Sequence, residues 1–195
     1  MAESNGAAPN AVRRLDGSEA VDLAALAAVF DDLQYALRCC EHLVGVLGRP
    51  DADPVLVEAL WTGALVGYVR CFSARQAVLT EADLKELQLD GDVTEFHDMI
   101  KKLRDHYASR HLNPRESFTI GVAQSNDGKP TGVAVVSTPR PLVDDTTVRL
   151  LGRVAYALSG LLDARIQKTQ NDVLGAAGRL SPGDLSKLPL VHLSG

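Results

Sequence analysis

The stretch VTEFHDMIKKLRDHYASRHLNPRESFTIGVA, residues 93–123, decides the fold because its hydrophobic period changes within it. In its first part, apolar residues recur every three or four positions, as along one face of a helix, at Val93, Phe96, Ile100, Leu103 and Tyr107. Asn113-Pro114 disfavours further helix, because a proline pushes the preceding residue toward extended backbone. After it, β-branched residues become frequent in 117–123. We therefore predict a helix that fades near Arg110 and then a strand.

A second β-branched run occupies residues 131–137, and Ser125-Asn126-Asp127-Gly128 between the two runs has the composition of a tight turn. The two runs predict a β-hairpin at 117–138. An isolated hairpin is only marginally stable in water. We therefore expect it to lie against the helices or to pair across a dimer.

Two long helices are predicted before this stretch. Apolar residues at alternating steps of four and three indicate one long helix that begins near Ser18; they are Leu26, Phe30, Leu33, Leu37, Cys40, Val44 and Leu47. Gly48 and Pro50 end it. Asp53-Pro54 then supplies an N-cap and a proline at the first helical position of a helix expected to run to about Leu79. Small residues on one face of this second helix, Gly63 and Gly67 among them, would let a neighbouring backbone approach closely.

Capping signals place the remaining helices. Thr80 with Asp83 opens a short helix that Gly91 stops, and Asp92 with Glu95 opens the helix of the 93–123 stretch. A further helix should begin near Asp144 or Asp145 and end between residues 169 and 179. The prediction is a mainly α fold, a helical bundle of four to five helices with one inserted β-hairpin. Residues 1–17 are expected to be a flexible N-terminal arm, 18–179 the bundle, and 180–195 a C-terminal tail.

Composition narrows the class of protein. The chain has 195 residues, 46% hydrophobic, with a net charge of −5, which suits one soluble domain with an ordinary core. Its first residues do not form a secretory signal, so we expect a cytoplasmic protein. The cysteines Cys39, Cys40 and Cys71 lack metal-ligand spacing and are expected to be small buried hydrophobes. The common phosphate-loop, nucleophile-elbow and zinc motifs are absent, so no cofactor or metal is predicted.

The residues from Lys101 to Arg115 form a basic segment. It holds five Lys or Arg against one Asp, a net charge of +4, so the rest of the chain carries −9. His97, Arg104 and His111 are seven residues apart and would point in nearly the same direction from a helix. Two helical turns separate Arg104 from His111 by about 10 Å along the axis. The two side chains reach one phosphate only if the helix end bends or a second protomer completes the site.

This segment resembles the Arg-polar-x(3–5)-His signature of HEPN domains, which are helical bundles of bacterial toxins, antiviral systems and CRISPR-associated ribonucleases. Arg104-Asp105 is followed by His111 after six intervening residues, and then by Asn113-Pro114 and the predicted hairpin. The resemblance spans about residues 28–165, and its specific part is under a dozen residues long.

The resemblance implies metal-independent RNA cleavage. His111 would be general base or general acid, Arg104 would stabilise charge on the phosphate, and Asp105 would orient one of them. Lys101, Lys102 and Arg110 would hold the RNA backbone. An active form would be a homodimer of a toxin or phage-defence type, with RNA as substrate and a protein partner such as an antitoxin.

Other interpretations stay open at this point, because a fold does not determine a function. The alternative is a non-catalytic helical dimer that acts as a protein-interaction or regulatory module. A bundle that binds a small molecule is a third. A homodimer is expected for either of the first two, because the apolar helix faces suggest an interface larger than one core and symmetric pairing is the commonest assembly.

Overall fold

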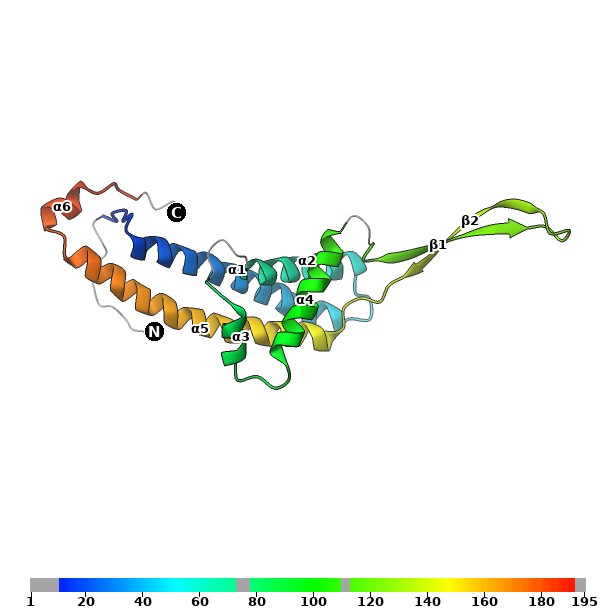
Figure 1. Ribbon diagram of the computed structural model, residues 1–195, viewed down its shortest axis with the longest axis horizontal. Coiled ribbons are helices and arrows are strands. Elements are labelled where there is room, and N and C mark those ends of the chain that lie inside the picture. The colour runs from blue at the N-terminus through cyan, green and yellow to red at the C-terminus, as the bar shows by residue number, and fades with distance from the viewer. Residues whose placement is uncertain (1–10, 73–77, 110–112, 192–195) are drawn as a thin grey trace. The chain divides into compact units, whose positions relative to one another are not determined.

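The computed structural model describes residues 11–72, 78–109 and 113–191. Its helices are α1 (Ser18–Leu47), α2 (Pro54–Arg70), α3 (Glu81–Glu86), α4 (Val93–Ala108), α5 (Asp145–Gly178) and α6 (Pro182–Lys187). Strands β1 (Glu116–Gln124) and β2 (Pro130–Pro139) follow α4 and precede α5 in the chain, and they project from the helices as a hairpin (Figure 1). The fold class is as predicted, a mainly α helical bundle with one inserted β-hairpin.

Local capping explains where several helices begin. The Asp53 side chain accepts a hydrogen bond from the backbone N–H of Val55 at 2.9 Å, at the start of α2. The capping box predicted at Thr80 and Asp83 is present at the start of α3. Asp92 caps α4 by accepting from the N–H of Glu95 at 2.9 Å. The prediction that α1 ends before Gly48 is confirmed.

Two predicted helix ends are wrong. α2 ends at Arg70 rather than near Leu79. Just beyond its end the hydrogen bonds tighten to three residues, from the Cys71 N–H to the Tyr68 carbonyl and from the Phe72 N–H to the Val69 carbonyl. Leu79 is instead buried just before the cap of α3. α3 ends at Glu86, five residues before Gly91, whose positive φ of 91° lies in the loop that leads to α4.

The chain divides into two compact units, and α1 and α5 contribute to both. Residues 29–160 form the larger unit, which holds α2, α3, α4 and the hairpin. Its core includes apolar side chains from α1 to α5, among them Leu33, Ala36 and Leu43 of α1, Trp61, Leu65 and Tyr68 of α2, Leu84 of α3, Phe96 and Ile100 of α4, and Leu151 and Leu158 of α5.

The small-residue face of α2 packs against α1 of the same chain. A Cβ atom added at Gly67 would lie 3.2 Å from the Asp32 carbonyl oxygen, and one at Gly63 would lie 2.9 Å from the Tyr35 hydroxyl. The close approach predicted for these glycines is therefore present, and it is made within one chain. A homodimer consequently needs another surface.

The three cysteines are buried and form no disulfide, as predicted. Burial raises the pKa of the Cys40 and Cys71 thiols to about 12 and raises that of Cys39 as well. Thiols of this kind are poor nucleophiles near neutral pH.

The smaller unit comprises residues 1–28 and 161–195, as far as they are described. Within it the C-terminal tail contacts the segment that precedes α1. Arg13 and Leu190 form an antiparallel β-bridge, and the Arg13 guanidinium donates to the Leu188 carbonyl at 2.8 Å. The tail carries the short helix α6, which Ser181 caps by accepting from the N–H of Asp184. None of the described helices is both long enough and apolar enough to cross a membrane.

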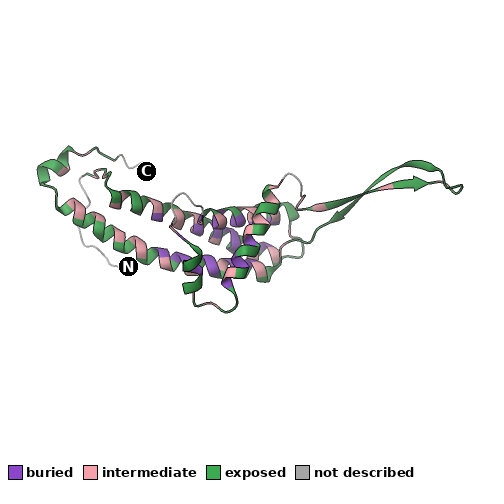
Figure 2. Ribbon diagram, in the orientation of Figure 1, coloured by how far each residue is buried: buried purple, intermediate pink, exposed green. Residues whose placement is uncertain are grey.

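The predicted hairpin is confirmed, and of the two arrangements expected for it, the one in which the strands pack against the helices is not found in the described chain. Ile120 pairs with Val135 at the middle of the antiparallel ladder, and Gly128 adopts a positive φ of 79° in the turn. Nearly all residues of both strands are exposed (Figure 2). The strands extend about 30 Å at 3.3 Å per residue, which takes them beyond the helix ends. Among the described residues, the base of the hairpin is held by contacts such as the hydrogen bond from the Arg140 N–H to the Arg115 carbonyl.

Candidate functional site: a cationic cavity beside Arg104

α4 places Arg104 at the edge of a buried helix face. Phe96 and Ile100 on this face are buried in the core, and Arg104 follows Ile100 by four residues, so it lies one turn further along the same side. Its side chain is 38% exposed. The apolar spacing that forms the helix thus also directs a guanidinium toward the boundary between core and solvent.

Arg104 lines a cavity of about 430 Å³ between α4, the end of α2 and the start of α3. We name this space the Arg104 cavity. Its described polar lining consists of Arg70, Thr80, Glu81, His97, Lys101 and Arg104, and its apolar lining of Val66, Val69, Phe72, Leu79 and Ala108. Three cationic side chains and one carboxylate therefore belong to this lining, and each cation is paired with at least one carboxylate. A cavity of this volume can hold a small anion or one nucleotide.

The Arg104 guanidinium has unused hydrogen-bonding capacity. Its Nε atom lies 3.3 Å from Asp105 Oδ1, which makes an ion pair. The same Nε atom is buried and forms no hydrogen bond with the described part of the chain. A buried donor without an acceptor costs free energy, and a bound anion would remove that cost.

Arg70 and Lys101 are held by acidic partners. Arg70 Nε lies 3.4 Å from Asp32 Oδ2, and Lys101 Nζ lies 3.8 Å from Glu81 Oε1 and 3.6 Å from Asp98 Oδ1. These pairs position both cations at the wall of the Arg104 cavity. Because both cations are substantially exposed, the pairs themselves contribute little to stability.

His97 contributes a buried side chain to the lining. It is almost completely buried, and its Nδ1 atom lies 2.9 Å from the Tyr68 hydroxyl in a buried hydrogen bond. The Phe72 ring packs on it with 4.4 Å between ring centroids. Burial, and then the charge of Lys101, lowers the pKa of His97. The imidazole is therefore neutral at pH 7.

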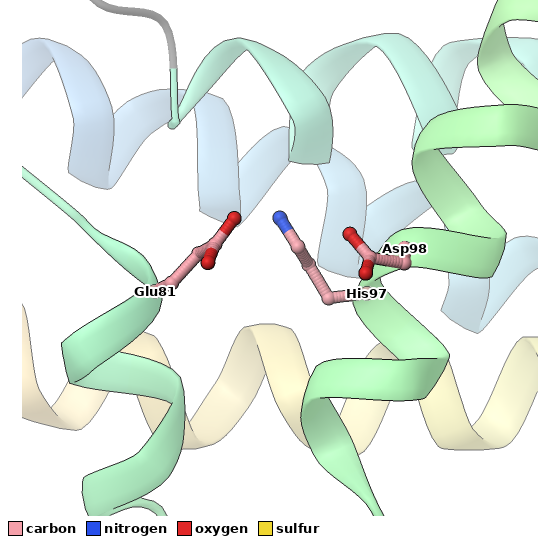
Figure 3. Close-up of side chains that lie close together, drawn as sticks. All are labelled: Glu81, His97 and Asp98. Carbon is pink, nitrogen blue, oxygen red and sulfur yellow. The ribbon is translucent and has the colours of Figure 1, made fainter.

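Glu81, His97 and Asp98 bring one ligand atom each to within 4.8 Å of one another, close enough to hold a metal ion (Figure 3). In this view the His97 ring lies between the two carboxylates. The Lys101 ammonium is already within 4 Å of both carboxylates and supplies the positive charge that a metal ion would bring. We therefore assign this cluster as an ion-pair link between α3 and α4.

The structure brings together two of the predicted site residues, Lys101 and Arg104, in one cavity. Lys102 and Asp105 are exposed and are not among the residues that line it. Arg110 and His111 lie outside the described residues.

Three of the titratable residues that line the Arg104 cavity were not among the predicted site residues: Arg70, Glu81 and His97. The seven-residue spacing from His97 to Arg104 was a signal for one of them. Arg70 and Glu81 come from other helices, and no local pattern connects them with Arg104.

Burial of His97 predicts a pH-dependent stability. Its pKa is lower in the folded protein than the ordinary value of about 6.5, so the unfolded chain binds a proton first as the pH falls. The free energy of unfolding should therefore decrease as the pH falls below about 6.5, by up to about 1.4 kcal/mol per pH unit for this one proton. Urea unfolding at pH 7.5, 6.5 and 5.5 measures it, and His97→Gln should flatten the slope. An equally steep slope in that variant would contradict the assignment.

Comparison of the chain with family models, with curated proteins and with solved structures found no match.

Proposed function

We propose that this chain is a HEPN-like, metal-independent ribonuclease, cytoplasmic and of a toxin or phage-defence type, that acts as a homodimer. The observation that carries the proposal is the Arg104 cavity. Arg104 lies there with a buried Nε atom that makes no hydrogen bond among the described residues, beside two further cations. A scissile phosphate would give this donor an acceptor.

The proposed chemistry needs no metal. The ribose 2′-hydroxyl attacks the neighbouring phosphorus and the bond to the 5′-oxygen of the next nucleotide breaks, which leaves a 2′,3′-cyclic phosphate. His111 either takes the 2′-hydroxyl proton or protonates the leaving 5′-oxygen, and water exchanges the other proton. Arg104 stabilises the charge that develops on the phosphate oxygens. Asp105, whose carboxylate contacts Arg104 Nε, orients the guanidinium. A second protomer brings another copy of the motif to the site, which overcomes the distance between Arg104 and His111 along the helix.

The lining of the cavity supports RNA as the ligand. Phe72 offers an aromatic ring to an unstacked base, and proteins commonly read single-stranded RNA in this way. Lys101 contributes charge at the cavity wall, whereas Lys102 and Arg110 would contact the RNA backbone outside it.

A second candidate function is a non-catalytic helical dimer that serves as a protein-interaction or regulatory module. The observation that favours it is the hairpin, whose strands are exposed and carry large apolar side chains. This function would need no chemistry at Arg104.

The experiment compares cleavage of a panel of fluorescently labelled RNAs by the unsubstituted protein and by Arg104→Ala. We expect Arg104→Ala to lower the cleavage rate about 100-fold or more. Arg153→Ala is the matched control, because it removes the same side chain from an exposed position of α5 that does not line the cavity, and should leave the rate unchanged. EDTA should have no effect.

Lys102→Ala separates binding from catalysis. This change should weaken RNA binding, more strongly at low salt, and leave the rate of the bound complex unaltered. The ribonuclease proposal fails if the unsubstituted protein leaves every RNA intact, or if Arg104→Ala cleaves at the normal rate. Loss of cleavage in EDTA would contradict metal independence and would direct attention to Glu81, His97 and Asp98.

A further inference from the structure

The hairpin has two chemically different faces. The register places Phe118, Ile120, Val122, Val133 and Val135 on one side of the ladder. We name this side the apolar hairpin face. The opposite side carries Thr119, Gly121, Ala123, Gly132, Ala134 and Val136, which are mostly small or polar. The alternation along both strands has therefore concentrated the large apolar side chains on one surface.

The apolar hairpin face is uncovered in the single chain. Its five side chains are 55% to 73% exposed. At about 60–120 Å² for each side chain, they form a patch of roughly 500 Å². The largest apolar patch of a soluble monomer is typically about 300–600 Å² and is often an interaction site, and a two-stranded hairpin alone is marginally stable. Both facts indicate that another surface covers this face.

The charge distribution on the hairpin argues for the identity of that surface. Residues 117–124 and 131–138 contain no Asp, Glu, Lys or Arg. Nucleic acid is bound through cations, and a charged peptide needs complementary charges, so neither fits this face. An uncharged, apolar face is complementary to another face of the same kind, as a two-fold interface requires.

The available area is sufficient for two copies. Two faces of roughly 500 Å² bury about 1,000 Å² in total, the lower bound for a specific interface. Packing the two hairpins face to face, about 10 Å apart as in a β-sandwich, would cover all five side chains in each copy. Pairing only the strand edges would leave the same side chains in water.

We propose that the apolar hairpin face packs against the same face of a second copy of this chain, which forms the homodimer. The inference deepens the homodimer of the proposed function and does not depend on RNA cleavage. The small-residue face of α2, which packs on α1 of its own chain, is not needed for it.

The test uses two neighbouring valines of β2. Val135 lies on the apolar hairpin face at 64% exposure, and Val136 lies on the opposite face at 53% exposure. Val135→Asp places an unpaired charge in the proposed interface and should weaken dimerisation about 100-fold or more, whereas Val136→Asp should leave it within a few-fold of normal. Light scattering coupled to size-exclusion chromatography, over a range of micromolar concentrations, measures the dissociation.

A cysteine pair tests the same face without a charge. Oxidation of Val135→Cys should produce a covalent dimer, and oxidation of Val136→Cys should produce little. The native thiols are buried and provide a low background. A reducing agent should reverse the link. This measurement decides the question even if Val135→Asp perturbs the hairpin.

Several outcomes would overturn the proposal. The proposal fails if the unsubstituted protein is a monomer. It also fails if Val135→Asp still forms the dimer and Val136→Cys crosslinks as well as Val135→Cys. Binding of a monomeric protein to uncharged phosphatidylcholine vesicles, abolished by Val135→Asp, would identify a lipid surface as the occupant instead. An absence of RNA cleavage leaves these expectations unchanged, because only the oligomeric state is measured.

Discussion

Alanine at His111 is expected to lower the rate of RNA cleavage about 100-fold or more, because the proposed reaction needs a proton-transfer group of near-neutral pKa. RNA binding should remain close to that of the unsubstituted protein, since one imidazole adds little to phosphate affinity. Single-turnover rates at saturating protein separate the two quantities. Added imidazole should restore part of the lost activity.

The other histidines of α4 serve as controls for this prediction. His106 is exposed and lines a different cavity, beside Trp61, so His106→Ala should leave cleavage nearly unchanged. His97 lines the Arg104 cavity, but its Nδ1 atom is bonded to the Tyr68 hydroxyl. His97→Gln should therefore reduce stability more than the rate of the folded protein. If His97→Gln lowered the cleavage rate 100-fold and His111→Ala stayed active, proton transfer would be assigned to His97. That result would contradict the role of His111.

Alanine at Trp61 is expected to remove about 3–5 kcal/mol from the free energy of unfolding. Trp61 is 2% exposed, and with Tyr107, Pro114, Pro141 and other residues it lines a space of about 350 Å³. It therefore supports α2, α4, the hairpin base and the start of α5 together. Truncation leaves a cavity that elements fixed elsewhere can fill only in part. The loss is large beside the 5–15 kcal/mol typical of a domain.

The matched control for Trp61 is Val55→Ala on the same helix. Val55 is 72% exposed, so this change should alter the free energy of unfolding by less than about 0.5 kcal/mol. Urea unfolding followed by far-UV circular dichroism measures both variants. A Trp61→Ala protein as stable as Val55→Ala would contradict the central place of Trp61 in the core.

The candidate site was partly predictable. Lys101 and Arg104 share one helix, and their separation of three residues brings them to the same side. Arg70 and Glu81 reach the same cavity from other elements. A resemblance centred on one short segment indicates the chemistry of that segment, but it cannot name residues that only folding brings near.

The sequence by itself determined the elements whose signals are local. The start of α2 follows from Asp53-Pro54, and the hairpin follows from two β-branched runs around a turn that contains Gly128. Burial of the cysteines likewise follows from their place within apolar helical stretches. Each of these features depends on residues within a few positions of one another, where capping, backbone preference and hydrophobic period act directly.

Only the tertiary structure decided the rest. It ended α2 at Arg70, where the helix period alone would have continued. It packed Gly67 against α1 of the same chain and left the apolar hairpin face open. It also placed His97 beside Tyr68 and Phe72 at the wall of the Arg104 cavity. These outcomes depend on contacts between residues far apart in the chain. The free energy of packing determines such contacts, and no local sequence pattern encodes them.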